Sequence, residues 1–145
     1  MKRTGLWLGA AIAIVLIGAI GFIAYRYLAP VQVDIVGEAD GVPFTIATIP
    51  RTVLARPGEM VKVVYRIQNN DLMPVSAYGA ITIGPAKAQD QMQVFLSQCG
   101  GINTYQNSSA DDYNVMFRVQ PAGLTGSTHL VLKHTFTPST PSNPQ

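Results

Sequence analysis

The chain has 145 residues, of which 48% are hydrophobic and only 12% are charged, well below the roughly 25% of charged residues in an average soluble domain. Three of the ten basic residues lie within residues 1–29, which leaves seven basic against eight acidic residues in the rest of the chain. A nucleic-acid-binding protein needs a basic face, so this balance argues against nucleic acid as a partner. The single cysteine excludes an intrachain disulfide.

The N-terminal segment predicts a membrane anchor. Residues 6–24 contain no charged side chain, and as a helix they would span roughly 28 Å, close to the ~30 Å hydrocarbon core of a bilayer. Lys2 and Arg3 precede this apolar run, whereas the acidic Asp34 and Glu38 follow it. The positive-inside bias therefore places the N-terminus in the cytoplasm and the rest of the chain on the outer side of the inner or plasma membrane.

A cleaved signal peptide is the alternative interpretation of this segment. The apolar core of a signal peptide is usually about 7–15 residues long and ends at a small-x-small cleavage site. Here the run is longer, and two tyrosines and an arginine follow it. We therefore expect a cytoplasmic N-terminus at residues 1–5, an uncleaved transmembrane helix at 6–27 and a linker with the first strand at 28–41.

Beyond residue 30, apolar and polar side chains alternate. The alternation is clearest over residues 61–68, 113–120 and 129–136, and it is typical of strands with one buried face. Five weaker strand candidates, separated by turn residues, are residues 31–36, 44–47, 52–55, 77–83 and 92–96. We therefore predict an all-β fold, an immunoglobulin-like antiparallel β-sandwich over residues 42–137, with a disordered tail at 138–145.

Cys99 is the main candidate for chemistry. It follows an apolar strand and precedes two glycines, so we expect it at a strand end or in a loop. A thiolate suits Cu(I) or zinc, but one thiolate holds a metal poorly and needs a second donor. Met92 is the nearest thioether in the sequence, and a second copy of the chain would offer another Cys99. The other interpretation is that Cys99 is a small buried hydrophobic residue, as free cysteines often are.

The two histidines do not form a metal site with each other. His129 and His134 lie five residues apart on one predicted strand, so their side chains point to opposite faces. His134 falls on the apolar face, where a core histidine is expected rather than a ligand, and His129 is expected at a solvated edge. No spacing of Ser, His and Asp indicates a catalytic triad and no phosphate-binding motif occurs, so we predict that the protein is not an enzyme.

Several short segments of the chain, taken in order, are similar to the motifs of one known protein family. The segments are residues 42–45, Pro57-Gly58-Glu59, Val64-Tyr65-Arg66 with Asn69, residues 80–87, Gln98-Cys99, residues 115–119 and residues 132–136. Together they resemble the CtaG family of cytochrome c oxidase copper-assembly proteins over roughly residues 42–137. In that family a single membrane helix carries an immunoglobulin-like domain on the outer side. The domain binds Cu(I) through cysteines and helps to deliver it to the copper B centre of the large subunit of cytochrome c oxidase.

By this resemblance Cys99 would be the first thiolate of the copper motif, although the chain departs from the family pattern. Gly101 stands where the second cysteine of the Cys-x-Cys motif would be, and His134 stands where the family tends to have tyrosine. One chain therefore cannot offer two thiolates. Copper transfer would need Cys99 from the two chains of a homodimer, or Cys99 with a Met or His of the fold.

We therefore expect a membrane-anchored, copper chaperone-like protein with Cys99 as the Cu(I) ligand and Met92 as an accessory ligand. Such a site is expected to be exposed, because a closed site would not release its ion. The alternative is a membrane-tethered sandwich without metal, which stabilises an oxidase or another membrane complex and in which Cys99 is packing. A third interpretation is a redox role, in which Cys99 forms an intermolecular disulfide.

Overall fold

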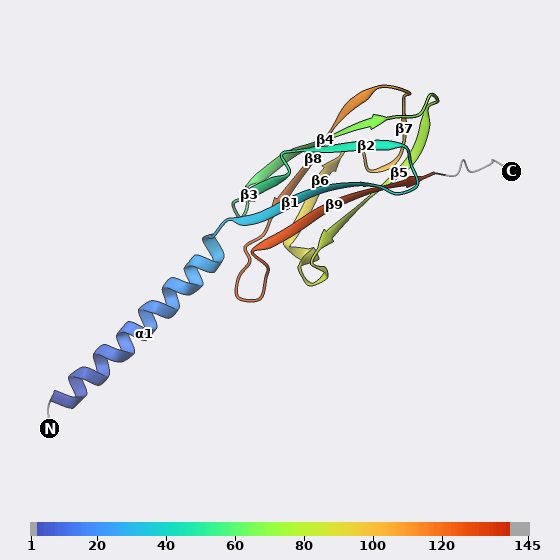
Figure 1. The fold of residues 1–145 in the computed structure, drawn as a ribbon. Helices are drawn as coiled ribbons and strands as arrows, with labels where there is room; N and C mark the ends of the chain where they lie inside the picture. Colours follow the sequence, from blue (N-terminus) through green and yellow to red (C-terminus); the bar gives the residue numbers. More distant parts are fainter. Residues whose placement is uncertain (1–2, 140–145) are drawn as a thin grey trace.

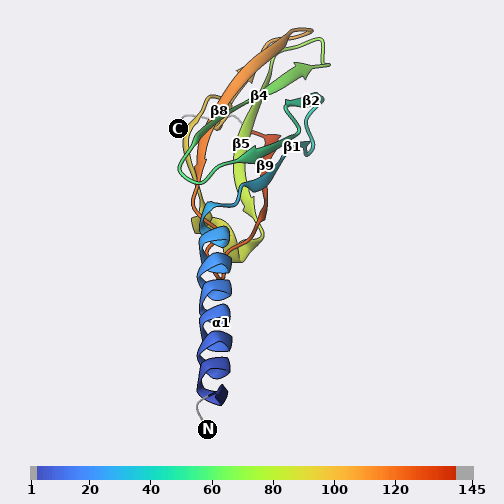
Figure 2. The same cartoon turned by 90° about the vertical axis from the view of Figure 1, so that its left-hand side faces the viewer.

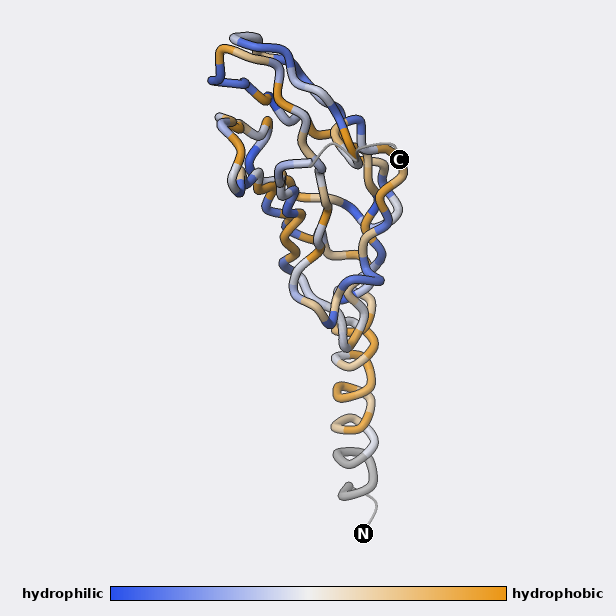
Figure 3. The backbone as a smooth tube through the Cα atoms, turned by 90° about the vertical axis from the view of Figure 1, so that its right-hand side faces the viewer, coloured by the Kyte–Doolittle hydropathy of each residue, from blue (hydrophilic) through white to orange (hydrophobic). Residues whose placement is uncertain are grey.

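The N-terminal apolar run forms one continuous helix, α1 (Arg3–Leu28), in the computed structural model, which describes residues 3–139. Its part Gly9–Leu28 has a mean hydropathy of 2.0 and is long and apolar enough to cross a membrane, and most of this part is coloured as hydrophobic in Figure 3. A helix satisfies its own backbone hydrogen bonds, which lipid requires. Residues 1–2 of the expected cytoplasmic N-terminus and 140–145 of the expected tail lie outside the described residues.

Two β-sheets pack face to face beyond the helix (Figure 1). The first has the order β3-β1-β9-β5-β7. Its strands are β1 (Val31–Ala39), β3 (Thr52–Ala55), β5 (Val75–Gly84), β7 (Gly101–Tyr105) and β9 (His129–Pro138). The second has the order β2-β4-β8-β6. Its strands are β2 (Phe44–Ile49), β4 (Met60–Asn69), β6 (Met92–Ser97) and β8 (Ala110–Val119).

The prediction of an all-β, immunoglobulin-like sandwich behind one apolar helix is confirmed. The strand pairs are antiparallel except for β1 and β9, which run parallel over eight registered positions from Gln32↔His129 to Ala39↔Phe136. The expected linker at 28–41 is mostly strand, because β1 begins three residues after α1 ends. Pro138, assigned to the tail, is the last residue of β9.

Two short elements were not predicted. The 3₁₀ helix η1 (Ala86–Gln91) has too few residues to show a helical period. Strand β7 starts with a glycine, and Tyr105 is its one fully buried side chain, so the alternation that marks the other strands is weak there. β8 also begins earlier than expected, because the ladder continues through Asp112, whose carboxylate forms a two-pronged ion pair with Arg66 on β4.

The core lies between the sheets and is built from the inward-facing side chains of alternate positions. The fully buried large side chains include Val31, Val33, Val63, Tyr65, Ile67, Val115, Phe117, Leu130, Leu132 and Phe136. Most of these positions were predicted from the period of two, since alternate residues of a strand share one face. The half of the core farther from α1 is aromatic, with the rings of Phe44 and Tyr105 packed at a centroid distance of 4.7 Å.

Asn69 is a buried polar residue whose loss should destabilise the fold. Its amide nitrogen donates to the carbonyl oxygens of Met73 (2.9 Å) and Tyr105 (3.0 Å), and its side-chain oxygen accepts from the amide of Asp71 (2.9 Å). Asn69→Ala removes the donor of both carbonyls, of which that of Tyr105 is buried and that of Met73 partly buried, so we expect a loss of about 1–3 kcal/mol in unfolding free energy. Denaturant unfolding of the full chain in detergent measures this loss.

The neighbouring Asn70→Ala is the matched control for this prediction. Asn70 is exposed, and its side chain makes a single hydrogen bond, to the hydroxyl of Thr45. This variant should unfold with nearly the wild-type free energy. Equal stabilities of the two variants would show that the buried amide does not hold the loop after β4.

Candidate functional site

Cys99 lies in the tight turn between β6 and β7, as expected for a strand end or loop. The amide of Gly100 donates to the carbonyl oxygen of Ser97 (3.3 Å), and Gly101 follows with a φ of +75°, a conformation that favours glycine. The turn nevertheless directs the Cys99 side chain into the sandwich, where it is 0% exposed. The expectation of an exposed thiol is therefore wrong.

His134 is the second member of the site, and it comes from the middle of β9. Its Nδ1 lies 3.5 Å from the Cys99 Sγ, although the two residues are 35 positions apart in the sequence. His134 is also 0% exposed, so its expected place on the apolar face is confirmed. No spacing along the chain indicates its contact with Cys99.

Gly79 on β5 explains how the turn reaches His134. Residue 79 is paired with Gly101 on β7 and with Phe136 on β9, so β5 separates β9 from the turn before β7, and the turn must fold over residue 79 to approach His134. A Cβ atom at residue 79 would stand 2.1 Å from the Cys99 carbonyl oxygen and 2.8 Å from the His134 Nε2. Only a glycine therefore allows the turn to pack this closely over β5.

Aromatic side chains enclose the histidine. The His134 ring stacks on Phe136 at a centroid distance of 4.7 Å and meets the edge of Tyr65 at 5.3 Å. The Tyr65 hydroxyl donates to the carbonyl oxygens of Val36 and Leu132, each at 3.4 Å. The His134 Nε2 has no hydrogen-bond partner among the described residues. The imidazole is thus fixed by packing, with one nitrogen at the sulfur and the other unsatisfied.

Both members of the pair are uncharged at neutral pH. Burial raises the pKa of the Cys99 thiol to about 11 and lowers the pKa of His134 to about 4, because the low-dielectric interior disfavours the charged form of each group. A neutral thiol and a neutral imidazole at 3.5 Å form a weak hydrogen bond. The imidazole is already in the form that binds metals, whereas the thiol must first release its proton.

The other residues considered as ligands lie elsewhere. Met92 begins β6 and Ser97 ends it, so five residues of extended strand separate Met92 from the turn of Cys99 by roughly 17 Å. The expected accessory role of Met92 is therefore not supported. His129 is exposed on the outer face, where its Nε2 lies 2.7 Å from an Asp34 oxygen. Within residues 3–139, no group of three or more His, Cys, Asp and Glu side chains could hold a metal.

The lowered pKa of His134 predicts an acid-sensitive fold in the metal-free protein. Between about pH 6.5 and pH 4 the unfolded chain takes up a proton that the folded chain does not, so unfolding becomes easier as the pH falls through this window. The total effect is at most roughly 3 kcal/mol. We expect His134→Phe to lose this part of the pH dependence, measured by denaturant unfolding at several pH values.

His129→Gln is the control for this pH dependence, because His129 lies on the exposed outer face. The control should lose stability below pH 6.5 more steeply than His134→Phe does, since it retains His134. If His134→Phe and the wild type lose stability in parallel over this window, the neutral buried imidazole is not the cause.

The burial of Cys99 predicts slow labelling of the native thiol. A thiol reagent needs an exposed thiolate, so Cys99 should react in the native protein only through opening of the turn. Gly79→Ala should displace the turn at a cost of about 1–3 kcal/mol and speed the labelling about 5–150-fold. Gly84→Ala is the control on the same strand, since the nearest atom to its Cβ would be 3.8 Å away. Fast labelling of the wild type would contradict the buried site.

Comparison with known proteins assigns no family to this chain. No family model matches it. No curated protein matches it either. The resemblance of its short segments to the CtaG family therefore stays a prediction from the sequence.

Proposed function

We propose that the protein is a membrane-anchored copper carrier of the CtaG type, in which Cys99 and His134 hold Cu(I) for delivery to the copper B centre of the large subunit of cytochrome c oxidase. The observation that carries the proposal is the 3.5 Å separation of the Cys99 Sγ and the His134 Nδ1. The His134 nitrogen would be the second donor, from the same chain, in place of the second cysteine that this chain lacks.

The donor chemistry of the pair fits a soft ion. Thiolate sulfur suits Cu(I) and zinc, and imidazole nitrogen suits both metals as well. With the bond lengths typical of zinc, about 2.3 Å to sulfur and about 2.0–2.1 Å to nitrogen, donors 3.5 Å apart would subtend an angle of roughly 105–110° at a shared ion of that size. Two donors at this angle occupy one side of the ion and leave positions for the ligands of an acceptor, which a carrier requires.

Loading of the site must release one proton. Cu(I) replaces the thiol proton of Cys99, so that a sulfur–copper bond forms and H⁺ leaves, and the neutral imidazole binds without losing a proton. The oxidation state of copper does not change in this step. Since the pKa of Cys99 is raised to about 11 by burial, the metal competes with a tightly held proton, and affinity should fall as the pH falls.

Exchange of copper also requires the turn of Cys99 to open. Its exposed supports include a hydrogen bond from the side-chain amide of Asn103 to the Gly100 carbonyl oxygen (3.2 Å). The Gln98 side-chain oxygen accepts from both the side-chain amide (2.9 Å) and the backbone amide (2.7 Å) of Asn114, whose carbonyl oxygen accepts from the Gln98 backbone amide (3.0 Å). Exposed hydrogen bonds of this kind compete with water, and elements held by them open at low free energy. Opening at this turn would expose the sulfur and leave the rest of the sandwich intact.

The membrane location is part of the same proposal. Lys2 and Arg3 before the apolar run and the acidic residues after it favour a cytoplasmic N-terminus. The sandwich would then stand on the outer or periplasmic face of the inner or plasma membrane. Lateral diffusion in that membrane would bring it to the oxidase, and a homodimer would bring two such sites together.

The second candidate function is a membrane-tethered interaction module without metal. Complete burial of both Cys99 and His134 favours it, because a thiol and an imidazole joined by a hydrogen bond also fill a core. In that case Cys99 is packing, and the protein would stabilise an oxidase or another membrane complex through strand edges and loops.

Titration with Cu(I) separates the two functions. The full chain in detergent, titrated against a chromophoric Cu(I) chelator, should bind one ion per chain. Cys99→Ser should abolish binding. His134→Phe should weaken it by at least about 100-fold, since even loss of a partner behind a ligand costs 10–100-fold. Met92→Leu is the matched control and should bind like the wild type.

Each other result of the titration has a definite meaning. Unchanged binding by Cys99→Ser overturns the copper proposal and leaves the tethered module. Unchanged binding by His134→Phe removes the histidine from the site. One ion per two chains, lost in Cys99→Ser alone, would show that the sulfur atoms of a homodimer share the ion.

A further inference from the structure

Three elements meet where the sandwich joins the helix. They are the last turn of α1, the helix η1 and the loop of residues 120–128 between β8 and β9 (Figure 2). The Arg26 guanidinium on α1 reaches into the loop, where its Nε donates to the carbonyl oxygen of Gly123 (2.8 Å) and its second nitrogen donates to that of Gly126 (3.0 Å). The loop is therefore attached directly to the end of the apolar helix.

The same loop is also held from the side of the sandwich. The side chain of Gln91, at the end of η1, donates to the carbonyl oxygen of Ser127 (2.7 Å) and accepts from its amide (2.9 Å). Within the loop, the amide of Gly126 donates to the carbonyl oxygen of Ala122 (2.7 Å). A Cβ at residue 126 would stand 2.1 Å from that oxygen, so a glycine is needed for this tight turn. The loop thus has a fixed shape and place.

An exposed leucine lies between the two anchored glycines. Leu124 is 60% exposed, and on the adjoining turn of α1 Tyr27 is 49% and Leu28 is 76% exposed. A Cβ on the neighbouring Gly123 would lie 3.6 Å from the Tyr27 ring, which places the loop against this turn. These apolar side chains are continuous with the lipid-facing surface of α1.

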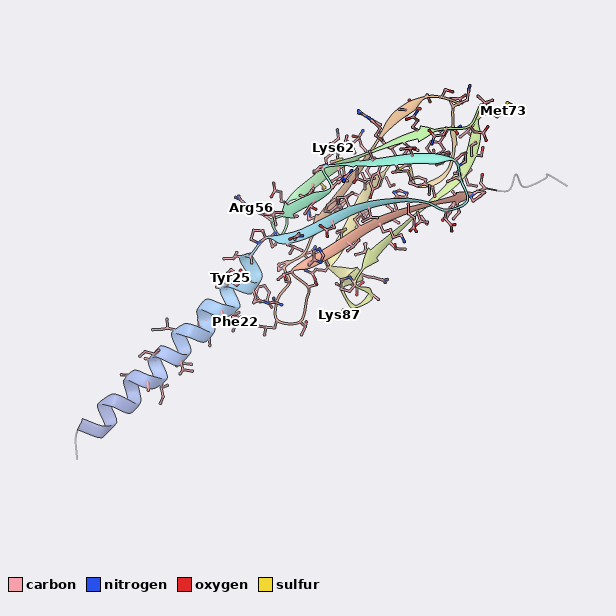
Figure 4. The ribbon with its side chains drawn as sticks, in the orientation of Figure 1. Phe22, Tyr25, Arg56, Lys62, Met73 and Lys87 are labelled. Carbon is pink, nitrogen blue, oxygen red and sulfur yellow. The ribbon has the colours of Figure 1, made fainter. Side chains whose placement is uncertain are left out.

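The charges around this end of the sandwich point to an apolar attachment. Residues 120–128 contain no charged side chain. Arg56 and Lys87 lie at the helix-proximal end (Figure 4), and the acidic Glu59 and Asp90 follow them closely in the same two segments. Together with Arg26, these residues carry an excess of one positive charge, well short of the cluster of about four or more basic residues that selects acidic lipids. The glycerol and headgroup region of a bilayer accepts leucine, tyrosine and polar backbone together.

We propose that the loop of residues 120–128 lies in the lipid–water interface, with Leu124 inserted among the lipids beside Tyr27. The inference rests on the proposed membrane anchor. The sandwich then stands on the bilayer at two places, the helix and the loop. β6 leads away from this end, so the turn of Cys99 is held up to roughly 20 Å farther from the lipid.

Fluorescence quenching in vesicles tests the position of the loop. In a Cys99→Ser background, Leu124→Cys provides a unique attachment site for an environment-sensitive fluorophore, and Leu72→Cys provides the control. Leu72 is 83% exposed and lies next to Met73, at the end of the sandwich far from the helix (Figure 4). The full chains are reconstituted in phosphatidylcholine vesicles that contain a lipid with a spin label near the headgroup.

The expected result is a blue-shifted emission at residue 124 that the shallow spin label quenches, with no shift or quenching at residue 72. Arg26→Leu removes both hydrogen bonds to the loop and should reduce the quenching at residue 124. Water-like emission at residue 124 overturns the inference. Equal quenching at both residues also overturns it, because the sandwich would then lie on its side. In 1 M salt the quenching should persist; its loss would show an electrostatic attachment instead.

Flotation of the vesicles after an alkaline wash distinguishes failure of the proposed membrane anchor from failure of the inference about the loop. If the chain leaves the vesicles, the proposed membrane anchor is wrong. If it stays with them and residue 124 reports water, only the inference about the loop is wrong. Leu124 is exposed and Leu72 more so, so neither labelled variant should disturb the fold.

Discussion

The close packing of the β6–β7 turn over Gly79 is the constraint on which the candidate site depends. The strand β5 pairs with β7 on one side and with β9 on the other. With no side chain at residue 79, the turn settles over β5 and brings the Cys99 sulfur to the His134 ring. Any larger residue would separate the two donors, although each strand would keep its pattern of buried residues. The arrangement of the site therefore depends on the glycine at residue 79 of β5, the strand that lies between the Cys99 turn and His134.

This arrangement places two opposing demands on the sulfur atom. In the structure the thiol is protonated and shielded, which protects an unpaired cysteine from oxidation. A carrier, however, must present the sulfur to its donor and acceptor. In the proposed function both demands are met by opening of the turn, whose hydrogen bonds at the surface are exposed to water. A purely structural role needs no such opening, and therefore the rate of opening is the physical quantity on which the two functions differ.

Much of the fold could be predicted because it follows from local patterns of apolar and polar residues. The uncharged run in α1 and the alternation in β4, β8 and β9 depend only on neighbouring residues, and they led to the helix and the sandwich. The short β7 was missed because Tyr105 is its one fully buried side chain. Cys99 was singled out by its chemistry, and His134 was placed in the core. Their contact was not predictable, since it follows from the registers Gly79↔Gly101 and Ile81↔His134, which no spacing along the chain reveals.

The short connection between α1 and β1 limits how the sandwich can move. Only Ala29 and Pro30 separate the two elements, Ala29 is buried, and its amide donates to the Tyr25 carbonyl oxygen. A proline with a fixed φ follows, and β1 then enters the sheet beside the strand that carries His134. The domain therefore cannot reorient freely about the end of the helix. With the helix in a membrane, as proposed, the domain would be held at a nearly constant height above the lipid, and a partner protein would have to contact it at that height.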